Sequence, residues 1–158
     1  MLGMMKAGIV AMPGTTQLTA KDILFRLQNS QARAVITDQK GFVLEASTAN
    51  LVLFNEGEGL VSPPLDQILV GVSLNTVEQL AGRLEIPFRH RRFTPQDLRK
   101  ATEVMLCSTS PCVWPVSRLD RGAIGRLGEN TIVQRLLRAW SELVGLDIAK
   151  QAAEFATR

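Results

Sequence analysis

The sequence predicts an α/β (α+β) domain with a barrel-like arrangement of strands, and three observations support this fold class. The chain has 158 residues, of which 46% are hydrophobic and 21% charged, as expected for one globular domain with a buried core. Short apolar runs between turn residues indicate strands. Longer stretches with apolar residues three and four positions apart indicate helices, and the two kinds of segment are mixed along the chain.

The first third of the chain predicts a strand, a helix and a hairpin. Residues 7–12 form a short apolar run that ends at a Pro-Gly turn, which favours an extended segment. Residues 19–31 predict a helix, with Thr19 as its N-cap. Residues 34–37 and 42–45 then flank a polar turn and predict a β-hairpin.

The remaining elements follow from the same signals. A second hairpin is predicted from residues 51–54 and 60–62 around a glycine-rich turn. Further segments are predicted as a helix at 74–84, an extended stretch at 87–93, a helix at 95–100, strands at 104–108 and 113–116, and a helix at 130–144. The last helix should bury Ile132, Val133, Leu136, Leu137, Trp140 and Leu143. After Gly145 we expect a frayed helix.

Composition and charge exclude several kinds of function. No apolar run reaches the roughly 18 residues of a membrane span, so we expect a cytoplasmic protein without a membrane partner. The single histidine, His90, excludes a multi-histidine metal site. Cys107 and Cys112 indicate small core residues rather than a disulfide framework. The net charge of +3 does not by itself indicate nucleic acid. The basic run 89–92 is either a solvated strand end or a patch that binds an anion or nucleic acid.

The most informative stretch is 45–73. It contains Glu45, then Asn50 five residues later, a hairpin, and an apolar turn that ends in residues 71–73 (Gly-Val-Ser). A second polar group, Ser108 and Thr109, follows the predicted strand 104–108. Each feature alone is typical of an ordinary hairpin, helix cap or turn, and only their joint spacing is specific.

These motifs, in this order, resemble the class IV (fold type IV) pyridoxal-phosphate enzymes. That family includes branched-chain and D-amino-acid aminotransferases and 4-amino-4-deoxychorismate lyase. The resemblance covers roughly residues 34–144 and is to the larger, C-terminal domain of such enzymes. It implies a domain at 36–145, followed by a C-terminal tail at 146–158.

The resemblance implies a role for each motif. Glu45 would keep the pyridine nitrogen of the cofactor protonated, and Asn50 would brace the Glu45 loop. The cofactor phosphate would be held by the start of a helix and by two hydroxyls. The implied cofactor-binding residues are Glu45, Asn50, Gly71, Val72, Ser73, Ser108 and Thr109.

The family also uses a lysine that forms a Schiff base with the cofactor, a little over thirty residues before the glutamate. The position that matches it here is Thr15. Lys6 and Lys21 lie 45 − 6 = 39 and 45 − 21 = 24 residues before Glu45, and neither fits that spacing. The resemblance therefore leaves no catalytic residue identified.

The N-terminal residues resemble another family. Residues 6–24 read KAGIVAMPGTTQLTAKDIL and look like a scaffold segment of medium-chain acyl-CoA synthetases, with a likeness that runs to about residue 35. No glycine-rich phosphate loop ending in lysine follows, so adenylation is not expected. We interpret the chain as a chimera in which segment 1–35, a strand, turn and helix, packs onto the next domain.

Two functional hypotheses follow. The first is a pyridoxal-phosphate-dependent aminotransferase or aminodeoxychorismate lyase-like domain that acts on amino acids and is impaired because the lysine is missing. It would bind pyridoxal 5′-phosphate weakly or not at all and form a homodimer. The alternative is a non-catalytic domain or chimera with a relic anion-binding cleft.

Overall fold

The computed structural model describes residues 35–46, 48–109, 112–120 and 122–156. The chain divides into two compact units, residues 1–33 and 34–158, and every described residue lies in the second. The predicted strand at 7–12, the predicted helix at 19–31 and Thr15 lie outside the described residues.

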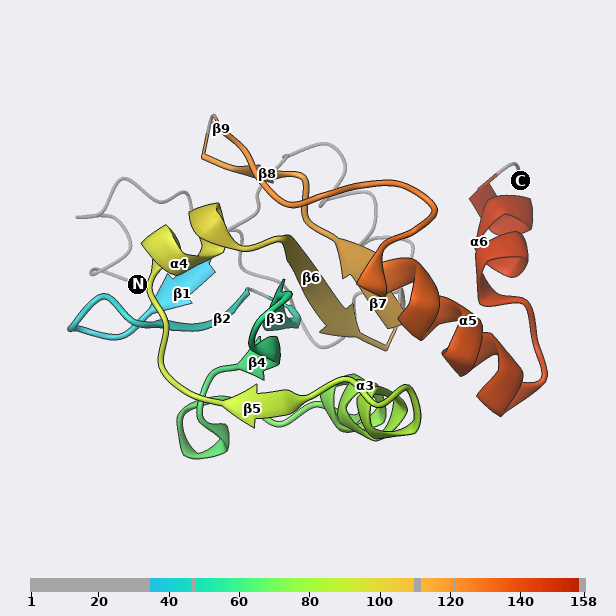
Figure 1. The fold of residues 1–158 in the computed structure, drawn as a ribbon, viewed down its shortest axis with the longest axis horizontal. Helices are drawn as coiled ribbons and strands as arrows, with labels where there is room; N and C mark the ends of the chain where they lie inside the picture. Colours follow the sequence, from blue (N-terminus) through green and yellow to red (C-terminus); the bar gives the residue numbers. More distant parts are fainter. Residues whose placement is uncertain (1–34, 47, 110–111, 121, 157–158) are drawn as a thin grey trace, which may run out of the picture. The chain divides into compact units, whose positions relative to one another are not determined.

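A five-stranded sheet forms the centre of the described unit (Figure 1). Its strands are β3 (Asn50–Asn55), β4 (Gly59–Ser62), β5 (Phe88–His90), β6 (Glu103–Ser108) and β7 (Cys112–Pro115), in the spatial order β5-β4-β3-β6-β7. Neighbouring strands are antiparallel except β4 and β5, which are parallel. Strands β1 (Val35–Thr37) and β2 (Val43–Ala46) form the first predicted hairpin, and β3 and β4 form the second.

A third, short hairpin joins β8 (Arg118–Leu119) to β9 (Gly122–Ala123). The sequence did not predict this hairpin because its strands are two residues long and carry no alternating apolar pattern. Asp120, in its turn, has a φ of 54°, a conformation that aspartate tolerates better than most residues.

The sheet is buried on both faces because side chains alternate along its central strands. In β3, Val52 and Phe54 contribute to one apolar cluster, whereas Leu51 and Leu53 contribute to another on the opposite face. Helices α3 (Val72–Arg83) and α5 (Ile132–Val144) cover the first face, and α4 (Pro95–Lys100) covers the second (Figure 1). The mixed α/β fold class is therefore confirmed.

Local capping signals explain where the helices begin and end. Thr94 and Asp97 form a reciprocal capping box at α4, with proline at the first helical position. Thr131 caps α5, which ends at Gly145 with a φ of 68°. A short 3₁₀ turn, η1 (Leu65–Gln67), precedes α3, and α3 begins two residues before the predicted start at 74.

The structure corrects one expectation, agrees with a second and adds an observation about Trp114. Leu143 is 42% exposed rather than buried, because the last turn of α5 extends past the sheet (Figure 1). The tail after Gly145 forms α6 (Ile148–Ala156), in agreement with the helix expected there. Trp114 is 54% exposed and so lies outside the core, because β7 is an edge strand of the sheet.

An ion pair and a glycine hold the edge strand β5 in place. Arg91 donates from Nε and Nη2 to the two carboxylate oxygens of Glu58, at 2.5 and 2.6 Å. The guanidinium group holds the pKa of Glu58 below its usual value. Gly59 has a φ of 87°, and a Cβ there would lie 2.2 Å from the Pro87 carbonyl oxygen, so this close approach requires glycine.

Within the described part of the chain, no helix combines the length and the apolar character needed to cross a membrane.

Candidate phosphate-binding site

Asn50 connects the start of β3 to the loop before α3. Its side-chain nitrogen donates to the Leu69 carbonyl at 2.8 Å, and its side-chain oxygen accepts from the Gly71 N–H at 3.1 Å. Asn50 is 5% exposed, so both of its amide atoms depend on these backbone partners. The side chain therefore determines where the backbone enters α3.

Gly71 permits this contact because it lacks a side chain. A Cβ at this position would lie 2.6 Å from Asn50 Oδ1, closer than non-bonded atoms approach. The φ of Gly71 is −81°, so the requirement for glycine here is steric rather than conformational.

The first turn of α3 leaves two backbone donors available. Gly71 is the N-cap residue and supplies no side-chain cap, while its carbonyl accepts from Leu74 and Asn75. The N–H groups of Val72 and Ser73 have no acceptor among the described residues. Such groups, together with the helix dipole, favour an anion at this end of a helix.

Glu45, in β2, approaches the same loop. Its Oε1 lies 3.5 Å from the Leu69 nitrogen, a long hydrogen bond in which Leu69 is the donor. The Leu69 backbone is thus contacted at its N–H by Glu45 and at its carbonyl by Asn50. Side chains from two different strands converge on one residue of the loop.

Ser108 and Thr109 lie where β6 ends. Cys107 is the register partner of Asn50, and Ser108 follows it as the last residue of β6. Ser108 is partly buried and Thr109 is exposed. No hydrogen bond joins either residue to α3 within the described ranges, so strand pairing alone brings Ser108 to the edge where Asn50 begins β3.

Leu69 is the residue that sequence reasoning missed. Its side chain is 79% exposed, and only its backbone takes part in the site. A backbone contact leaves no signature in the identity of the residue, so the sequence offered no signal for it.

The described residues supply the kinds of group that a bound phosphate requires. They provide backbone donors at the start of α3 and a glycine at a close approach, and the Glu45 carboxylate of β2 contacts the same loop. The lysines of the described part are Lys40, Lys100 and Lys150, which lie in the β1–β2 turn, at the end of α4 and in α6. None of them is on an element that carries the site.

Comparison with known proteins establishes the family. The family model described as amino-transferase class IV matches residues 20–119, more than half of the chain. The protein therefore belongs to the class IV aminotransferase family. The resemblance seen in the sequence motifs starts at about residue 34. The family model matches from residue 20, further upstream.

Individual relatives agree with this assignment. A D-alanine aminotransferase of Staphylococcus epidermidis is 27% identical over 115 residues, which are 72% of this chain and 40% of the relative. The chain thus spans less than half the length of this relative. A short match of 36 residues, 61% identical, is to a mitochondrial acyl-coenzyme A synthetase of Mus musculus and covers 23% of this chain and 6% of that protein. The predicted resemblance of the N-terminal segment is thereby confirmed.

Solved structures share the fold. A putative branched-chain amino acid aminotransferase from Thermotoga maritima is 28% identical with a TM-score of 0.68, covering 86% of this chain and 49% of that one. A branched-chain aminotransferase from the archaeon Thermoproteus uzoniensis, solved with norvaline, is 27% identical with a TM-score of 0.65, covering 78% and 42%. A 4-amino-4-deoxychorismate lyase from Pseudomonas aeruginosa is 28% identical with a TM-score of 0.64, covering 73% and 41%.

Proposed function

We propose that this chain is a pyridoxal-phosphate-binding aminotransferase or aminodeoxychorismate lyase-like domain that acts on amino acids and is impaired in catalysis. The observation that carries the proposal is the contact of Asn50 with Leu69 and Gly71, which presents the free end of α3. Pyridoxal phosphate, when bound, draws electrons from the carbon that bears the substrate's amino group.

The chain's own residues would share the work of binding. The Val72 and Ser73 N–H groups would donate to the phosphate, and the Ser108 and Thr109 hydroxyls would add further donors. Glu45 would hold a proton on the pyridine nitrogen. Asn50 and Gly71 would position these groups without touching the phosphate, because the Asn50 amide already bonds to the loop backbone.

The second candidate function is a non-catalytic domain, or a chimera, with a relic anion-binding cleft. The residue at the family's lysine position, Thr15, favours it, because a hydroxyl cannot take the place of the amine. Both candidates require the same phosphate site and differ only in chemistry.

Gly71→Ala is expected to weaken binding of pyridoxal phosphate by about tenfold, equivalent to about 1.4 kcal/mol. The added Cβ meets Asn50 Oδ1 at 2.6 Å and so displaces either the amide or the start of α3. Equilibrium dialysis with pyridoxal phosphate measures the affinity of each variant.

Gly82→Ala is the matched control for this substitution. A Cβ at Gly82, within the same helix, would meet nothing within 4 Å. It should leave the affinity unchanged and add up to about 1 kcal/mol to the free energy of unfolding. If Gly71→Ala and Gly82→Ala bind pyridoxal phosphate with equal affinity, the N-terminus of α3 does not hold the cofactor phosphate.

We also propose that the chain associates with itself, as a homodimer. Large apolar side chains of the described unit are exposed, among them Leu69 at 79%, Val72 at 73% and Trp114 at 54%. Covering such surface favours association. Light scattering at high micromolar concentration should give twice the mass of one chain, and a monomer mass would contradict this.

A further inference from the structure

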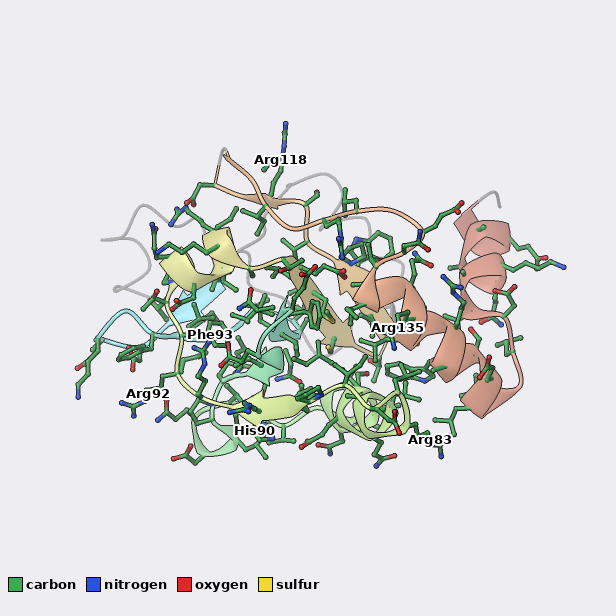
Figure 2. All side chains as sticks on the ribbon, in the orientation of Figure 1. Arg83, His90, Arg92, Phe93, Arg118 and Arg135 are labelled. Atoms are coloured by element: carbon green, nitrogen blue, oxygen red, sulfur yellow. The ribbon has the colours of Figure 1, made fainter. Side chains whose placement is uncertain are left out.

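We draw no further inference here: the strongest candidate, the side-chain cluster that joins Ser62 at the end of β4, His90 on β5 and Glu78 on α3 (Figure 2), carries none, because the serine hydroxyl is completely buried and closed to a substrate, and a neutral imidazole with its proton on Nε2 already makes both contacts.

Discussion

Thr15→Lys should convert a chain that holds pyridoxal phosphate reversibly into one that borohydride joins to the cofactor covalently. The sequence resemblance predicts that Thr15 occupies the family's lysine position, and a hydroxyl cannot form a carbon–nitrogen double bond with the cofactor's aldehyde. The wild-type chain should therefore show no trapped cofactor and negligible transamination. Loss of general acid–base help by itself typically costs a factor of about 10²–10⁴.

Mass spectrometry after reduction decides the result, with Thr16→Lys as the neighbouring control. If cofactor is trapped at position 15 of Thr15→Lys, the result supports an aminotransferase-like domain that lacks only the amine of its lysine. Trapping on Lys6 or Lys21 of the unmodified chain would show that the alignment is wrong and that the chain already carries its amine. If neither substitution traps cofactor, the non-catalytic hypothesis is favoured.

Glu103→Leu should lower the free energy of unfolding by about 3 kcal/mol, because leucine would leave two buried donors without acceptors at about 1–3 kcal/mol each. Glu103 is 1% exposed, and its two carboxylate oxygens accept from the Ile132 and Val133 N–H groups at 2.9 and 3.2 Å. Arg126 Nη2 lies 3.8 Å from the same carboxylate.

Urea unfolding measures this loss, and two further variants define its cause. Glu103→Gln keeps one oxygen acceptor and should show a smaller loss than leucine. Glu56→Leu, in the exposed turn between β3 and β4, should stay within about 0.5 kcal/mol of the wild-type value. A loss below about 1 kcal/mol for Glu103→Leu would show that the Ile132 and Val133 N–H groups do not depend on Glu103.

The sequence predicts those parts of the fold that depend on neighbours along the chain. Short apolar runs on either side of a turn predict the β1–β2 and β3–β4 hairpins, and Thr94 followed by proline predicts α4. These signals work because caps, turns and side-chain periodicity act within about one turn of helix or one strand pair. The motifs between Glu45 and Ser73 were also visible, and the family to which they point is confirmed.

The individual functions of the candidate site residues remain predictions. The sequence placed Glu45, Asn50 and Gly71 in one motif but could not show how they meet. Their connection runs through the backbone of Leu69, 19 residues after Asn50. A side-chain pattern carries no information about a backbone acceptor at that distance.

The sequence alone therefore determined the family, the mixed fold class and most described strands and helices, because these depend on local patterns and on spacing. The tertiary structure alone decided the parallel pairing of β4 with β5, the capping of α5 by Glu103 and the joining of Ser62, His90 and Glu78. It also decided that Leu143 is exposed, because the last turn of α5 extends past the sheet. Most of these contacts connect residues far apart in the sequence, and folding brings them together through packing on a shared sheet rather than through local preference.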